Sequence, residues 1–190
     1  MILAVAACSG SPDSQSTPAS TAGAGLPPAI LADLAPIFDP QVKPLGLRVT
    51  RAALVSANPR VPSPAGTHLA IYVEPASHWS AAQHVEVIVP LARTLASNLF
   101  ARWPELESFD VCQEPSPGVD DRPAPPPVTT VDMTRAASDA IDWETADLIT
   151  LAVASARRAD FSLSASPSLG HDPALRAALE KAKTIVDSGG

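Results

Sequence analysis

THLAIYVEPASHWSAAQHVEVIVPLARTLASNLFARWPELESFDVCQE, residues 67–114, decides the fold, and it reads as a strand, a long helix and a second strand. Within it, apolar residues recur every three or four positions, which is the period of one buried helical face: Ala81, Val85, Ile88, Ala92, Leu95, Leu99 and Trp103. The alternating valines of residues 85–89 would suit a strand, but that pattern is much shorter. We therefore predict a helix over residues 80–103.

The ends of this helix carry their own signals. Ser80 is followed three residues later by Gln83, a capping box in which each side chain satisfies a backbone amide of the other residue. Pro104 ends the helix. Pro90 lies inside it, where a proline removes one backbone hydrogen bond and crowds the preceding turn, so we expect a kink there.

Further elements lie on either side of this segment. Alternating apolar residues predict four strands, at residues 45–55, 69–73, 109–111 and 128–135. Helices are predicted at residues 26–38, ended early by Pro36 and Pro40, at residues 142–158 with Asp142 as the cap, and from Asp172 to just before Gly189. Strands in pairs with a long helix between the pairs predict an α+β two-layer sandwich, an antiparallel sheet of about four strands covered on one face by helices. Residues 26–190 would form this single domain.

The N-terminal residues have a different character. Residues 1–8 are apolar and end in Val5-Ala6-Ala7-Cys8, after which a Ser, Pro, Gly and Ala-rich stretch runs over residues 9–25. An apolar run before a small-residue cleavage site is typical of an export signal. Val5-Ala6-Ala7-Cys8 resembles the lipobox of bacterial lipoproteins, and the abundance of Ala, Pro and Arg is similar to that of actinobacterial cell-envelope lipoproteins. The resemblance implies a truncated signal over residues 1–8, lipidation of Cys8, a flexible tether over residues 9–25 and an extracytoplasmic, membrane-anchored location. An ordinary N-terminus that happens to contain Cys8 is the alternative.

Charge narrows the choice of partners. The chain carries 20 Asp and Glu against 13 Lys and Arg, a net charge of -7, with no basic stripe, so nucleic acid is not expected as a partner. The excess lies in residues 105–144, which hold ten acidic and two basic side chains. This segment includes Pro115, Pro117, Asp120 and Asp121 in a Pro-rich loop over residues 114–127. These four residues are our candidate partner-binding residues, while solvated loop acids are the alternative interpretation.

Signals for chemistry are weak. No Gly-x-Ser-x-Gly motif is present, so a hydrolase would have to assemble its His, Ser and Asp from distant positions, and we expect the four His at the surface or at strand edges. His78 and His84 are six residues apart, which does not fit a helical zinc pair. A calcium site around Asp120 lacks the alternation of an EF-hand loop. Cys112 is interpreted as a small buried residue, since the nearby Asp110 and Glu114 disfavour a thiolate. We expect no catalytic residue, no cofactor and no resident metal.

Three functions remain open at this point. The first is an anchored interaction or structural module of the cell envelope, with the Pro-rich loops at residues 58–66 and 114–127 as its contact surface. The second is a carrier of an apolar, lipid-like ligand held between the long helix and the sheet. The third, a hydrolase, requires a His within hydrogen-bond reach of a Ser or Cys.

Overall fold

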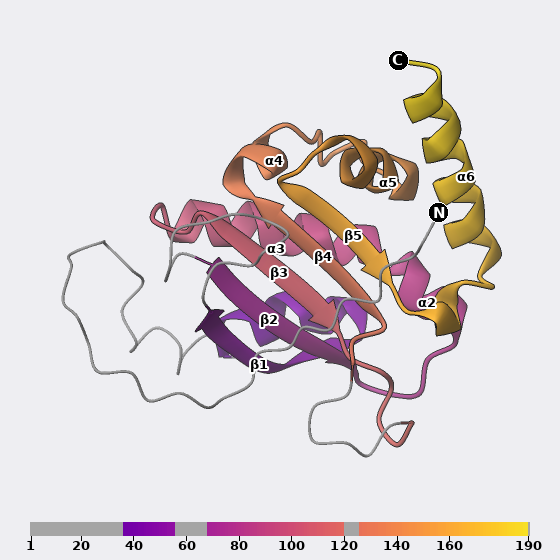
Figure 1. Ribbon diagram of the computed structural model, residues 1–190. Coiled ribbons are helices and arrows are strands. Elements are labelled where there is room, and N and C mark those ends of the chain that lie inside the picture. Colours follow the sequence, from indigo (N-terminus) through magenta and orange to yellow (C-terminus); the bar gives the residue numbers. More distant parts are fainter. Residues whose placement is uncertain (1–35, 56–67, 120–125, 190) are drawn as a thin grey trace.

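The computed structural model describes residues 36–55, 68–119 and 126–189, and it contains one five-stranded sheet with helices packed on one of its faces (Figure 1). The strands are β1 (Leu47–Val55), β2 (His68–Pro75), β3 (Ser108–Gln113), β4 (Thr129–Thr134) and β5 (Phe161–Ala165). The helices are α2 (Ala81–Glu86), α3 (Ile88–Arg102), α4 (Arg135–Asp139), α5 (Leu148–Arg157) and α6 (Pro173–Asp187), with short 3-10 turns η1 (Lys43–Leu45) and η2 (Pro167–Leu169). The α+β class is confirmed.

The sheet differs from the prediction in one pairing and one strand. Its order is β1-β2-β3-β4-β5, and every neighbouring pair is antiparallel except β2 and β3, which are parallel. The predicted all-antiparallel sheet is therefore wrong at this pair. The reason is the long helical connection, which carries the chain back along the sheet so that Ser108 pairs with His68, each the first residue of its strand. The prediction also missed β5, a short strand between two helices.

The central helix keeps its predicted start and its buried face, and it is interrupted in the turn before Pro90. The Ser80–Gln83 capping box is present, and α2 ends at Glu86. The break falls at Val87, the cap shared with α3, in the turn before Pro90, where the proline cannot donate to the carbonyl of Glu86. Pro90 occupies the first turn of α3, where a backbone N–H has no partner within the helix, so the proline costs little there. The helix ends at Arg102, shortly before Pro104, as predicted.

Two other helix boundaries differ from the prediction. The helix before β1 continues through residues 36–42, past Pro40, because Phe38 and Val42 are one turn apart and both are completely buried. The helix expected from residue 142 begins at Leu148, where Asp147 and Thr150 form a capping box. Asp142 instead caps a turn, accepting a hydrogen bond from the backbone N–H of Glu144. The last helix starts at Pro173 after the Asp172 cap, as predicted.

A single apolar core joins the helices to one face of the sheet. Leu91, Leu95 and Leu99 of α3 are at most 1% exposed and pack with Leu69, Ile71, Phe109, Val111 and Met133 of the central strands. Because strand side chains alternate between faces, the same strands present a second set of residues on the opposite side. That second face holds the candidate site.

Candidate functional site

The side of the sheet away from the helix-packed core is lined mainly by polar side chains. We call the following residues of β2, β3 and β4 the polar face: His68, Tyr72, Ser108, Asp110, Cys112, Thr130 and Asp132. They alternate with core residues along each strand, and each is at most 7% exposed. Apart from Ala70, Tyr72 and Cys112, which touch one another, no apolar cluster forms here within the described residues. Burying polar groups costs free energy unless they are hydrogen-bonded, so the contacts among these side chains matter.

One end of the polar face is formed by the first residues of β2 and β3. His68 and Ser108 are both completely buried, and the Nδ1 atom of His68 lies 2.7 Å from the Oγ atom of Ser108. The Nε2 atom of His68 lies 3.9 Å from the Oδ1 atom of Asp110. Asp110 pairs in register with Asp132 on β4, so two buried carboxyl groups stand on adjacent strands. Burial lowers the pKa of His68 to about 4, and this imidazole is therefore neutral at pH 7.

This end contains a Ser, a His and an Asp, the residue types of a catalytic triad, but they are not arranged as a triad. A hydrolase needs a nucleophile that substrate can reach and donors aimed at a developing oxyanion. Both His68 and Ser108 are 0% exposed, and the 3.9 Å separation from Asp110 is too long for an orienting hydrogen bond. They also begin two paired inner strands, whose amides are engaged in the sheet ladder. The pair therefore fits a buried polar contact better than an active site.

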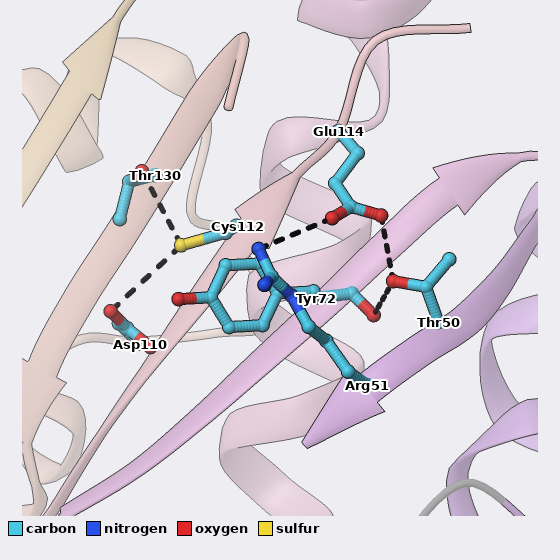
Figure 2. A network of polar contacts seen from close by, with 7 residues as sticks. All are labelled: Thr50, Arg51, Tyr72, Asp110, Cys112, Glu114 and Thr130. Atoms are coloured by element: carbon cyan, nitrogen blue, oxygen red, sulfur yellow. Dashed lines mark hydrogen bonds and ion pairs between the residues drawn. The ribbon is translucent and has the colours of Figure 1, made fainter. Parts of the chain in front are cut away.

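The middle of the polar face is centred on Cys112. Its sulfur lies 3.8 Å from Asp110 Oδ2 and 3.7 Å from the hydroxyl oxygen of Thr130, which donates to it (Figure 2). The thiol is completely buried, as the sequence predicted. It nevertheless lies among polar groups on the polar face and not within the large aliphatic core.

At the other end, an arginine of β1 connects the polar face to the start of a loop. The guanidinium of Arg51 lies 3.6 Å from the ring centre of Tyr72, and its Nη2 lies 3.4 Å from Glu114 Oε1 (Figure 2). The hydroxyl of Thr50 donates to Glu114 Oε2 at 2.7 Å. A β-bulge between Val49 and Arg51 allows this arrangement, because the extra residue bends the strand and re-aims the side chains beside it. We call Thr50, Arg51, Tyr72 and Glu114 the arginine network.

The loop after β3 starts directly at this network. The Glu114 amide donates to the carbonyl of Val73 at 2.7 Å. Ser116 is buried and its Oγ accepts the backbone N–H of Trp79 at 2.8 Å. Gly118 has a φ of 78°, the left-handed conformation that glycine adopts without strain. The part of the loop over residues 114–119 is therefore held by defined contacts.

The predicted site residues are placed unequally by the structure. Pro115 is half-buried and Pro117 is exposed, and both follow Glu114 in the anchored part of the loop. Asp120 and Asp121 lie outside the described residues, and so does Cys8. The acidic segment of residues 105–144 does not form one patch, because Asp110, Glu114 and Asp132 turn inward whereas Glu107 and Asp142 are exposed at separate places.

One expectation about this region needs correction. The Pro-rich loop at residues 58–66 lies outside the described residues, so its expected part in a contact surface with residues 114–127 stays a prediction. The His were expected at the surface or at strand edges, yet His68 and His84 are buried. The Nδ1 of His84 lies 3.2 Å from Gln113 Oε1, in the helix-packed half of the molecule. Burial is the larger effect on its pKa, which is lowered.

The sequence did not identify Thr50, Arg51 and Tyr72 as site residues. A usable signal was present, because polar residues occupy the alternate positions of three strands that are apolar at the other positions, as in Ser108, Asp110 and Cys112. A strand of an ordinary one-sided sheet would expose those positions to solvent. The parallel pairing of β2 and β3, which aligns Tyr72 with Cys112, could not be read from local patterns.

Across residues 36–55, 68–119 and 126–189, no three His, Cys, Asp or Glu side chains are grouped to hold a metal ion. In the same part of the chain, no helix combines the length and the apolar character needed to cross a membrane. The chain matches no protein-family model, no curated protein and no solved structure.

Proposed function

We propose that this protein is a membrane-anchored, extracytoplasmic interaction module that binds a partner of the cell envelope through the loop of residues 114–127 and the arginine network at its base. The proposal rests on one observation. Glu114 directly follows β3, binds Arg51 and Thr50, and begins the acidic, Pro-rich loop. The base of the loop is thereby tied to the arginine network, in which Glu114 and Tyr72 are buried and Thr50 and Arg51 are exposed.

The first residues of the loop are pre-organised for binding a partner. Contacts of Ser116 and Glu114 hold the first residues of the loop, and prolines restrict the backbone, so binding would cost less conformational entropy than ordering a free loop. Pro117 and Val119 are exposed there, with Val119 at 60%. Asp120 and Asp121 follow in the sequence, which favours a partner with a basic surface.

The test is affinity capture of envelope partners with a charge-neutralised loop. The variant Asp120→Asn/Asp121→Asn removes two acidic groups from the loop, and Asp139→Asn/Glu144→Gln removes two exposed acidic groups elsewhere. We expect the first variant to recover less of the partner than the parent protein, and the control to recover as much. Equal recovery with both variants would exclude the loop as the acidic contact.

The membrane anchor is a separate part of the proposal and has its own test. The support for it is the lipobox-like Val5-Ala6-Ala7-Cys8 followed by a polar stretch. Metabolic labelling with a palmitate analogue should mark the parent protein and leave the Cys8→Ala variant unlabelled. Labelling of both, or of neither, would contradict lipidation at Cys8.

The carrier and hydrolase alternatives receive less support from the geometry. The layer between α3 and the sheet, where an apolar ligand was expected, is filled by side chains such as Leu95 and Ile71 that are completely buried. A ligand there would have to displace them. The hydrolase alternative depends on His68 and Ser108, whose burial keeps substrate away.

A further inference from the structure

The two edges of the sheet are protected to different extents. β1 and β5 are the edge strands, and unpaired backbone groups on an edge can pair with another chain. On β5, the N–H of Leu163 donates to the side-chain oxygen of Ser155 at 3.0 Å. On β1, the N–H of Val49 donates to Asp39 Oδ1 at 2.6 Å. Each of these contacts occupies an edge amide with a side chain of the same molecule.

The second half of β1 lacks such protection. The carbonyl of Val73 accepts a hydrogen bond from the backbone N–H of Glu114, which follows β3. Because successive residues of a strand direct their backbone groups to opposite sides, the odd-numbered residues of β2 face β3. The even-numbered residues of β2 therefore face β1. Ala52 and Leu54 pair in register with Ile71 and Leu69, and they therefore direct their own N–H and C=O groups outward. Within the described residues, these outward groups have no hydrogen-bond partner.

We propose that this open half of β1 pairs antiparallel with the same segment of a second copy of this chain, in a register centred on Ala53. The two outward residues lie symmetrically on either side of Ala53. In this register Ala52 of each copy exchanges two hydrogen bonds with Leu54 of the other, four bonds in all, and the two sheets continue as one. A shift by two residues toward Thr50 would bring the bulge into the pairing and lose two of these bonds.

Side chains and charges favour the same register. Ala53 is exposed and small, so two copies can approach closely at the symmetry axis. Each Arg51 is balanced by Glu114 of its own chain, and each Arg48 by its own Glu74. The two Arg51 side chains would be four residues apart along the ladder, about 13 Å, which exceeds the distance over which charges interact strongly at physiological salt. Two copies therefore meet without like-charge repulsion. This inference goes beyond the proposed function, since it does not involve the loop after β3.

Disulfide trapping of Ala53→Cys tests the register directly. Residues facing each other across the axis form a non-hydrogen-bonded pair with Cα atoms about 4.5 Å apart, a separation that a disulfide spans. Mild oxidation of this variant should give a covalent dimer. The parent protein, which carries Cys8 and Cys112, sets the background, and Ala101→Cys, at an exposed position of α3, controls for random collision.

Sedimentation measurements of the full chain provide the second test. Ala52→Pro removes an outward N–H that the β1–β2 ladder does not use, so the monomer should keep its urea midpoint. The dimer dissociation constant should rise about tenfold or more, since two of the four bonds are lost. Ala53→Arg places two like charges at the axis and should give only monomer. A parent protein that stays monomeric at all concentrations would overturn the proposal, and so would an Ala53→Cys variant that cross-links no more than Ala101→Cys. In either case an extended segment of another protein would be the remaining candidate for pairing with this edge.

Discussion

On the helix side of the sheet, Leu69, Ile71 and Phe109 are completely buried among aliphatic side chains, whereas on the other side His68, Asp110 and Asp132 are buried almost as fully among polar groups. The two sets alternate along the same strands. Removing aliphatic side chains from water stabilises the fold, while removing imidazole and carboxyl groups from water costs free energy that their contacts only partly offset. The helix side therefore supplies stability. We expect the arginine network and the loop that begins at Glu114 to serve recognition instead.

The largest difference between the two sides should come from truncating Leu95. This α3 side chain is 0% exposed and lies in the aliphatic core. Leu95→Ala should lower the free energy of unfolding by about 3 kcal/mol, through lost burial and a residual cavity. The comparison on the other side is Cys112→Ala, which should cost about 1 kcal/mol because it removes one sulfur atom. Urea denaturation of both variants checks this, and equal losses would remove the energetic distinction between the faces.

The next largest effect is a pH dependence of the free energy of unfolding, which originates from His68 on the polar face. His68 has a folded-state pKa of about 4, against 6.5 for an ordinary imidazole, because burial disfavours its charged form. Between these values the unfolded chain binds a proton that the folded chain does not, so stability falls as the solution is acidified. The loss should reach about 2.5 kcal/mol by pH 4.5. His84 adds to this fall, since burial lowers its pKa too.

Urea titrations between pH 7.5 and pH 4.5 measure this effect. His68→Asn can keep a hydrogen bond to Ser108 and should remove the His68 share of the slope. His171→Asn, at an exposed position, is the matched control. Asp142, Asp147 and Asp160 have lowered pKa values through their hydrogen bonds, so they reduce stability only at still lower pH. A parent protein equally stable across this range would show that His68 is accessible to protons in the folded state.

A somewhat smaller loss of stability is expected from replacing Arg135, which binds the C-terminal end of α3. The guanidinium of Arg135 donates to the carbonyl oxygens of Phe100, Trp103, Pro104 and Leu106, at distances of 2.8 to 3.0 Å. A lysine carries the charge but not the planar fork, so Arg135→Lys should lower the free energy of unfolding by about 2 kcal/mol. Arg176→Lys, on the exposed side of α6, is the control and should have no measurable effect. Equal stability of both variants would show that charge alone suffices at Arg135.

The smallest effect should be the coupling within the arginine network. The Arg51 side chain is 41% exposed, so water and salt screen its attraction to Glu114. A double-mutant cycle with Arg51→Gln and Glu114→Gln should give a coupling free energy of about 0.5 kcal/mol. It should decrease further in high salt. A coupling of several kcal/mol would mean that the network contributes to stability, contrary to its proposed role.

The sequence predicted local structure better than the pairing of distant segments. The capping box at Ser80 and the buried stripe of α3 follow from local spacing, and both are confirmed. The two strand pairs on either side of the long helix were also predicted from alternating residues, and both are antiparallel as expected. The parallel β2–β3 pair was not, because it depends on the direction in which a long connection returns, and β5 has only Phe161 and Leu163 as strong signals.

The candidate site was predicted only in part. Pro115 and Pro117 were identified from composition, and the structure places them beside a network that composition does not reveal. Arg51 and Tyr72 are distant from Glu114 in sequence, and only the bulge in β1 and the sheet register bring them together. Such a convergence of three strands has no signature within any one of them.

Site-specific photo-crosslinking in envelope membranes tests most directly whether the base of the loop after β3, together with the arginine network, is the recognition surface. A photoreactive residue would replace exposed Pro117 at the loop base or, as the matched control, exposed Lys183 on α6. We expect a discrete cross-linked partner from position 117 that is lost in the Glu114→Gln background, and none from position 183. The same products from both positions, or none from position 117, would contradict the assignment of recognition to this end of the molecule.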